Sequence, residues 1–211
     1  MESTLRRGAG EPGLRLIETL GWNGTEFARL DLHLARLAGS AARLGWGCDI
    51  GAVRVALRGA VASDPLRVRV TLAATGAVAV ETAAMPAKIA LWQMGLADEQ
   101  LLSSDPWLSL KSTRRAAYDR ARATLASGLD EVVFQNERGE VCDGSITTVF
   151  FDAGEGLCTP PLRSGLLPGV LRAQMLAEGR AREAVLMAGD LNQVKLWVGN
   201  SLRGMMRARF S

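Results

Sequence analysis

The chain of 211 residues is long enough for one large domain or two smaller ones. Hydrophobic residues make up 48% and charged residues 22%, which is typical of a globular protein with an ordinary core. The net charge is +3, but its basic residues are scattered and build no stripe that could follow a phosphate backbone, so we expect no nucleic-acid partner. No run of about 18 apolar residues predicts a membrane span, and the first ten residues lack the apolar core of a secretory signal.

The cysteines and the single histidine limit which disulfide, metal and catalytic sites the chain can form. Cys48, Cys142 and Cys158 form an odd set without C-x-x-C spacing, which argues against a disulfide framework or a zinc knuckle. Reduced thiols and a cytoplasmic location are therefore expected. His33 is the only histidine, so a multi-histidine metal site is excluded and a Ser/His/Asp triad would depend on that residue. We expect no metal site.

Hydrophobic alternation and helical periodicity predict an α+β chain. Strands are expected at 14–22, 66–72, 77–83, 87–94, 131–135, 147–151, 183–187, 194–198 and 203–210. Helices are expected at 32–45, from 50 to about 64, at 112–126, at 168–180 and as a short turn at 190–193. Asp31 and Asp49 are candidate N-caps for the first two helices. The pattern suggests an N-terminal α+β domain (1–95), a connector (96–110) and a C-terminal domain (111–211).

Lys111 is the first candidate functional residue. The chain has three lysines (Lys88, Lys111 and Lys195) against 22 arginines. Arginine cannot replace lysine where a neutral amine is needed, because its guanidinium stays protonated. A lysine at the start of a predicted helix is therefore a candidate amine nucleophile for Schiff-base chemistry. Taken alone, it is also compatible with an ordinary surface lysine.

Five motifs in a fixed order change that balance: HLARL at 33–37, KSTRRAAYD at 111–119, NERGEVCDGSITTVF at 136–150, TPPL at 159–162 with LLPGVLR at 166–172, and GNSLRG at 199–204. Together they resemble the class IV, pyridoxal-phosphate-dependent family of branched-chain aminotransferases, D-amino-acid aminotransferases and 4-amino-4-deoxychorismate lyases. The likeness runs from about residue 14 to the end. It implies a two-domain fold-type IV enzyme, similar to D-amino-acid aminotransferase, with a smaller N-terminal α/β sandwich, a barrel-like C-terminal domain and a homodimeric assembly.

The resemblance implies that Lys111 carries pyridoxal 5'-phosphate as a Schiff base and that its released amine moves the α-proton. Asp143 matches the family glutamate that faces the pyridine nitrogen and keeps it protonated, which makes the ring an electron sink. Aspartate keeps the charge but is one methylene shorter. Without the resemblance, Asp143 would be an ordinary turn residue before Gly144.

The resemblance also implies three holders of the cofactor phosphate. Arg36 matches the arginine of the H-x-x-R-L helix and can bind phosphate through two hydrogen bonds. The backbone N–H groups of Val170 and Leu171 would add donors at the start of a helix, and Ser201 matches a hydroxyl residue of a C-terminal loop. Leu171 stands where many relatives have threonine. Outside the resemblance, these positions indicate a solvated helix face, a plain helix start and a loop hydroxyl.

Other positions are less defined. Arg115 and Arg203 are candidates for a substrate carboxylate, although solvent exposure is the alternative for both. Tyr118, the only tyrosine, either points at the cofactor or packs its helix against the sheet. Thr148 departs from the family's usual asparagine, and His33 is interpreted as structural. Relatives also carry roughly one more hairpin before the strand at 14–22.

The resemblance implies an enzyme of amino-acid metabolism that acts on a small amino compound. The GNSLRG stretch favours an aminodeoxychorismate lyase, an activity of folate biosynthesis, whereas the region around Lys111 resembles both lyases and aminotransferases. The sequence leaves these two activities open. A third hypothesis is a pseudoenzyme that binds a phosphorylated metabolite or a protein partner, suggested by the shortened start and by Asp143 and Leu171. Retention of Lys111 argues against it.

Overall fold

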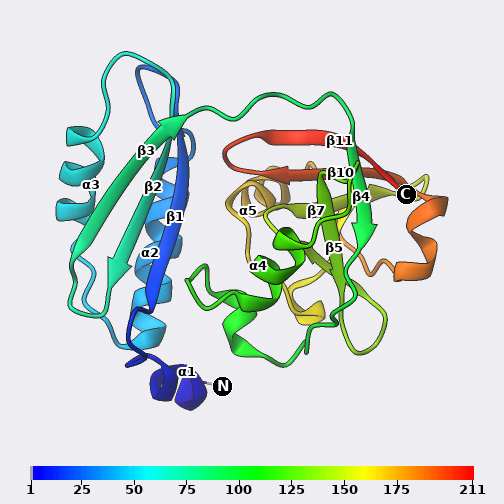
Figure 1. Ribbon diagram of the computed structural model, residues 1–211, viewed down its shortest axis with the longest axis horizontal. Coiled ribbons are helices and arrows are strands. Elements are labelled where there is room, and N and C mark those ends of the chain that lie inside the picture. Colours follow the sequence, from blue (N-terminus) through cyan, green and yellow to red (C-terminus); the bar gives the residue numbers. More distant parts are fainter. Residues whose placement is uncertain (1) are drawn as a thin grey trace. The chain divides into compact units, whose positions relative to one another are not determined.

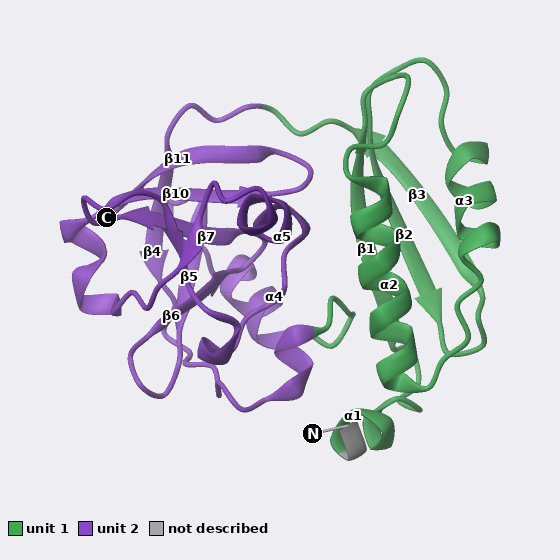
Figure 2. Cartoon of the chain, turned by 180° about the vertical axis from the view of Figure 1, so that it is seen from behind, with its two compact units in different colours: residues 1–87, 110–114 green, residues 88–109, 115–211 purple. Residues whose placement is uncertain are grey.

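A computed structural model describes residues 2–211, with side chains described from residue 4 onward. The chain forms two compact units (Figure 2). Unit 1 comprises residues 1–87 and 110–114, and unit 2 comprises residues 88–109 and 115–211. Within the described residues, no helix is both long enough and apolar enough to cross a membrane.

Unit 1 is a three-stranded antiparallel sheet with helices packed on it. The strands β1 (Arg15–Trp22), β2 (Leu66–Ala73) and β3 (Val78–Ala84) lie in the order β1-β2-β3. Helix α2 (Leu30–Leu44) packs against β1, and α3 (Ile50–Gly59) packs against β3, while the short α1 (Glu2–Gly8) packs against α2. Figures 1 and 2 show α2 lying over one face of the sheet. The strands predicted at 14–22, 66–72 and 77–83 and the helix predicted at 32–45 are confirmed, whereas the helix predicted from 50 to about 64 ends at Gly59.

The two predicted N-caps differ in outcome. Asp49 caps α3, and its side chain accepts a hydrogen bond from the backbone N–H of Ala52 at 3.0 Å. The prediction that Asp31 caps α2 is wrong. The helix begins at Leu30, because Arg29 adopts a left-handed conformation (φ 56°) that turns the chain into the helix two residues earlier than predicted. Asp31 lies in the first helical turn, where its negative charge interacts favourably with the positive end of the helix dipole.

The helix predicted at 112–126 is shorter than expected, since α4 spans Ala116–Ala123. The residues before it are extended and pair with β1. Ser112 bridges Leu16, and the backbone N–H of Ile17 donates to the carbonyl of Lys111 at 2.8 Å. The open edge of β1 satisfies these backbone groups, so the segment does not enter the helix. Lys111 therefore lies in an extended segment at the edge of the unit 1 sheet, not at the mouth of a helix.

Unit 2 contains an eight-stranded sheet in the order β6-β5-β4-β11-β10-β7-β8-β9. The sheet curls into a partial barrel (Figure 1), as expected for the C-terminal part of the chain. Its strands are β4 (Trp92–Leu96), β5 (Glu131–Gln135), β6 (Val141–Gly144), β7 (Thr148–Asp152), β8 (Cys158–Thr159), β9 (Arg182–Glu183), β10 (Lys195–Asn200) and β11 (Gly204–Phe210). Strands β6 and β8 were not predicted from the sequence, and the strand predicted at 183–187 is reduced to the two residues of β9.

Strand β4 belongs to unit 2, not to the N-terminal unit that the sequence analysis expected it to complete. It lies parallel to β11, where Trp92 pairs with Ala208, and parallel to β5, where Met94 pairs with Glu131. Parallel partners distant along the chain leave no local sequence signal, so the alternation alone could not place this strand.

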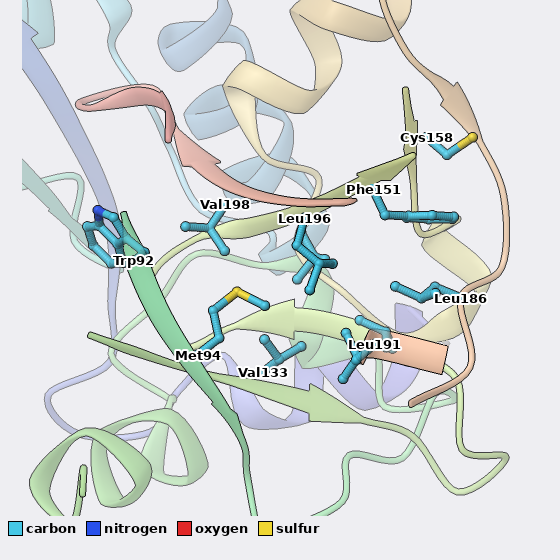
Figure 3. Close-up of a cluster of buried hydrophobic side chains, with 11 residues drawn as sticks. Trp92, Met94, Val133, Phe151, Cys158, Leu186, Leu191, Leu196 and Val198 are labelled. Atoms are coloured by element: carbon cyan, nitrogen blue, oxygen red, sulfur yellow. The ribbon is translucent and has the colours of Figure 1, made fainter. Parts of the chain in front are cut away.

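The core of unit 2 lies on the inner side of the curled sheet (Figure 3). Its buried side chains include Met94, Val133, Phe151 and Val198 from four different strands. Three 3-10 helices (Pro106–Ser109, Leu162–Ser164 and Ala188–Gln193) and α5 (Val170–Ala177) complete the unit. Helix α5 begins later than predicted, because Gly169 is its N-cap and the preceding proline lies outside it.

Candidate active site

Lys111 shares unit 1 with a buried ionic cluster. Its backbone carbonyl is hydrogen-bonded to β1, one residue before Glu18. Glu18 itself is buried and points at α2, where Arg36 donates from Nε to its Oε1 at 2.8 Å and from Nη2 to its Oε2 at 2.7 Å. Nδ1 of His33 lies 2.6 Å from the same Oε2. One strand and one helix thus hold Glu18, His33 and Arg36 together.

The charges in this cluster shift the protonation of its members. Burial alone would raise the pKa of Glu18, but the charge of Arg36 and the hydrogen bonds from His33 and Arg36 outweigh it and lower that pKa. Burial lowers the pKa of His33 despite its bond to Glu18, and the charges of Arg36 and Lys111 act in the same direction. The cluster therefore holds an ionised Glu18 and a neutral His33 that donates to it.

Arg36 lies against Glu18 rather than on a solvated helix face, and its binding of a phosphate stays a prediction. Its side chain is only 12% exposed. A guanidinium has five N–H donors, and the bidentate pair with Glu18 uses two of them. The sequence analysis missed Glu18. The sequence feature that could have revealed Glu18 is a carboxylate within a mostly apolar strand. Such a carboxylate is costly to bury unless it is paired.

In unit 2, Asp143 lies in β6, where all four residues are buried. Tyr118 of α4 packs edge-on against Phe134 with ring centroids 4.9 Å apart. Burial raises the pKa of Tyr118, and the charge of Asp143 raises that pKa further. The two side chains therefore interact electrostatically. Tyr118 also packs α4 against the sheet, which was the alternative role predicted for it.

The predicted phosphate-binding segments of unit 2 lie beside one another. A Cβ on Gly199 of β10 would lie 2.8 Å from Cδ2 of Leu171, so the residue that leads into the Ser201 loop touches the start of α5. A Cβ on Gly169, the N-cap, would lie 2.7 Å from Oγ1 of Thr148. Glycine permits both close approaches. Thr148, which departs from the family's asparagine, thus packs directly under the start of α5.

The candidate substrate arginines have contacts within unit 2. Arg115 donates from Nε to Asp119 at 2.8 Å and from Nη2 to the carbonyl of Ser145 at 3.0 Å. The guanidinium of Arg203 lies 5.5 Å from the ring centroid of Trp92 in a cation–π arrangement. Binding of a substrate carboxylate by either arginine stays a prediction.

The donor types within each unit suit groups of pyridoxal phosphate. In unit 1, Lys111 offers a primary amine and Arg36 a guanidinium; in unit 2, α5 offers the N–H groups of its first turn and Asp143 a buried carboxylate. Ser201 adds a buried hydroxyl residue. Among the side chains that the structure describes, no group of three or more His, Cys, Asp or Glu residues could hold a metal ion.

The chain belongs to the class IV aminotransferase family. Residues 15–209 match the family described as "Amino-transferase class IV", which takes in both units and every candidate site residue. It is therefore an enzyme of this pyridoxal-phosphate-dependent family.

Two curated relatives and two solved structures illustrate the similarity. The chain is 30% identical over 175 residues to the "Putative aminodeoxychorismate lyase" of Schizosaccharomyces pombe, covering 80% of this chain and 75% of that protein. It is 28% identical over 130 residues to the aminodeoxychorismate lyase of Saccharomyces cerevisiae, covering 53% of this chain but only 33% of the yeast protein.

Among solved structures, a "Putative amino-acid aminotransferase" from Mesorhizobium loti is 45% identical, with a TM-score of 0.90, and the match covers 94% of this chain and all of that one (100%). The PLP-bound form of a hypothetical aminotransferase from Mycobacterium tuberculosis is 22% identical, with a TM-score of 0.79, covering 97% of this chain and 83% of that one. The fold is therefore the expected fold-type IV arrangement.

Proposed function

We propose that this protein binds pyridoxal 5'-phosphate through Lys111 and acts on a small amino compound, as an aminotransferase or as an aminodeoxychorismate lyase. The observation that carries the proposal is the placement of Lys111 in unit 1. It lies on the edge of the same sheet whose β1 residue Glu18 holds Arg36 in a fixed orientation. An amine and an oriented guanidinium on one rigid unit suit a cofactor that carries both an aldehyde and a phosphate.

In this proposal the cofactor supplies an electron sink for the substrate's α-carbon. Lys111 would hold the aldehyde carbon, and its amine nitrogen would accept and return the substrate proton. Arg36, the N–H groups of Val170 and Leu171, and Ser201 would hold the phosphate. Asp143, a buried carboxylate of β6, would hold a proton on the pyridine nitrogen.

The relatives support both activities. The Mesorhizobium loti protein, at 45% identity, carries an aminotransferase name, while both curated relatives carry lyase names. The residues assigned above serve steps that the two activities share, so the proposal keeps both. Amino-donor screening with a set of 2-oxo acids, beside an assay for pyruvate release from aminodeoxychorismate, separates them.

We further propose that the protein acts in the cytoplasm as a homodimer. The three cysteines are unpaired, and Cys142 and Cys158 are buried, which suits a reducing compartment. Analytical ultracentrifugation tests the dimer: a sedimentation coefficient of a monomer at micromolar concentration would contradict it.

The cofactor assignment is tested by adding pyridoxal phosphate to the purified protein, recording visible absorbance, reducing with borohydride and mapping the labelled peptide. Because the chain has only three lysines, Lys88→Ala and Lys195→Ala are matched controls for Lys111→Ala. We expect the pyridoxyl label on Lys111 in the wild type and in both controls, and no label in Lys111→Ala. A label on Lys88 or Lys195 would remove the assignment of Lys111. No absorbance change in the wild type would favour the pseudoenzyme hypothesis.

A further inference from the structure

Glu131 is a fully buried carboxylate for which the proposed function has no role. It begins β5 and has 0% exposure. Both its oxygens face the turn that follows β6. Oε1 accepts from the backbone N–H of Ser145 at 3.1 Å and from the hydroxyl of the same residue. Oε2 accepts from the backbone N–H of Ile146 at 3.2 Å and from the hydroxyl of Thr147 at 2.8 Å. Four donors from three consecutive residues thus converge on one carboxylate.

The turn is also held from its other side by α4. Nη1 of Arg122 donates to the hydroxyl of Ser145 at 3.1 Å and lies 3.5 Å from Oε1 of Glu131. Arg115 donates to the carbonyl of Ser145 at 3.0 Å. The hydrogen bonds and the nearby guanidinium offset the free-energy cost of removing the Glu131 carboxylate from water. The same hydrogen bonds hold the turn in one conformation.

Gly144 explains how the carboxylate comes so close. A Cβ at this position would lie 2.9 Å from Oε2 of Glu131 and would collide with the hydroxyl of Thr147. Gly144 directly follows Asp143 in β6. The residue assigned to the pyridine nitrogen is therefore separated by a single glycine from the turn that Glu131 holds.

The same turn is connected to the loop that carries Ser201. The carbonyl of Ile146 accepts from Nδ2 of Asn200 at 3.2 Å. Oδ1 of Asn200 in turn accepts from the backbone N–H groups of Leu202 at 3.1 Å and Arg203 at 2.9 Å, which closes the loop around Ser201. A continuous chain of hydrogen bonds runs from Glu131 through Ile146 and Asn200 to residues 202 and 203.

We infer that Glu131 is a positioning residue that fixes, through this chain, both the segment bearing Asp143 and the loop bearing Ser201. The inference rests on the proposed function for its consequence in cofactor binding, but the coupling itself is a property of unit 2 alone. Glutamine cannot replace the carboxylate, because its amide offers one acceptor oxygen and turns an NH2 group toward N–H donors.

The coupling is tested by amide hydrogen exchange on the cofactor-free protein. In Glu131→Gln we expect exchange at Ile146, Leu202 and Arg203 to accelerate about tenfold or more, the factor that loss of one charged hydrogen bond gives. Ser145 is a poorer reporter, because its N–H also donates to the carbonyl of Val132 at 3.1 Å. In Asn200→Ala we expect acceleration at 202 and 203, with Ile146 still protected. Glu99→Gln is the control, since Glu99 pairs with Arg120 of the same helix but is exposed. Unchanged exchange at 202 and 203 in Glu131→Gln would overturn the inference. If that variant does not fold, Asn200→Ala carries the test, and unchanged exchange at 202 and 203 there would overturn it equally.

A second measurement separates positioning from general stability. Each variant is titrated with pyridoxal phosphate and with pyridoxal, which lacks the phosphate. We expect Asn200→Ala to weaken only pyridoxal phosphate, and Glu131→Gln to weaken both ligands by about tenfold or more. Equal affinities of Glu131→Gln and wild type would overturn the inference. A wild type that binds neither ligand would refute the proposed function, while the exchange data would still decide on the coupling.

Discussion

The substitution Glu18→Gln tests whether the buried cluster of unit 1 is as strong as its geometry indicates. The carboxylate is 3% exposed and receives hydrogen bonds at 2.8, 2.7 and 2.6 Å from Arg36 and His33. Removing one partner of a buried ion pair costs about 3–5 kcal/mol, because the remaining charge is left without compensation. Glutamine keeps one acceptor and the shape, so we expect a loss at the lower end, about 3 kcal/mol.

The matched control is Asp31→Asn. Asp31 also pairs with an arginine, Arg54, at 2.6 Å, but the two side chains are 87% and 39% exposed. Exposed pairs contribute about 0–1 kcal/mol, so this change should lower stability by no more than about 1 kcal/mol. Both variants begin from an Arg–carboxylate pair that joins α2 to a neighbouring element, β1 for Glu18–Arg36 and α3 for Asp31–Arg54. Burial is the main difference between them.

Urea denaturation followed by far-UV circular dichroism measures both losses at pH 7. Because the pKa of Glu18 is lowered on folding, its stabilisation is complete above the unfolded value of 4.5 and is lost as the pH falls through the folded value. The difference between wild type and Glu18→Gln should therefore shrink in acid. A loss below about 1 kcal/mol at pH 7, or a difference that grows in acid, would refute the reasoning.

Three further predictions use other parts of the chain. Gly144→Ala should lower stability by about 1–3 kcal/mol in thermal denaturation, because the added Cβ would collide with the Thr147 hydroxyl. Gly39→Ala, on the exposed face of α2, should instead raise stability by about 0.5–1 kcal/mol. The hydrogen bond from Arg138 holds the pKa of Glu140 at about 2, so the stabilisation by Glu140 is lost as the pH falls from 4.5 to about 2. In Glu140→Gln the melting temperature should therefore change less with pH over that interval than in the wild type. Melting temperatures that fall equally in the two proteins would contradict this expectation. Burial raises the pKa of Cys142 to about 12, so a thiol reagent at pH 8 should label this cysteine only after unfolding, and rapid labelling of the folded protein would contradict its burial.

Local sequence patterns predicted most of the elements. Alternation in the strand from Leu66 to Ala73 and helical spacing in Leu34, Leu37, Ala41 and Leu44 define elements that bury one face, and such periodicity is a property of each segment alone. The rarity of lysine made Lys111 the candidate cofactor lysine, and five motifs in order predicted the family, which the family match confirms. These signals need no knowledge of which elements meet.

Tertiary structure decided how the segments combine. The strand at Trp92–Leu96 pairs with β11 and β5. The extended segment after residue 110 pairs with β1, where the backbone carbonyl of Arg15 accepts from the N–H of Thr113 and the N–H of Arg15 donates to Oγ1 of the same residue, 98 positions along the chain. Glu18 and Glu131 became the centres of buried polar clusters for the same reason. A carboxylate in a strand has no local partner, and only the packing of distant elements supplies the donors that make its burial possible.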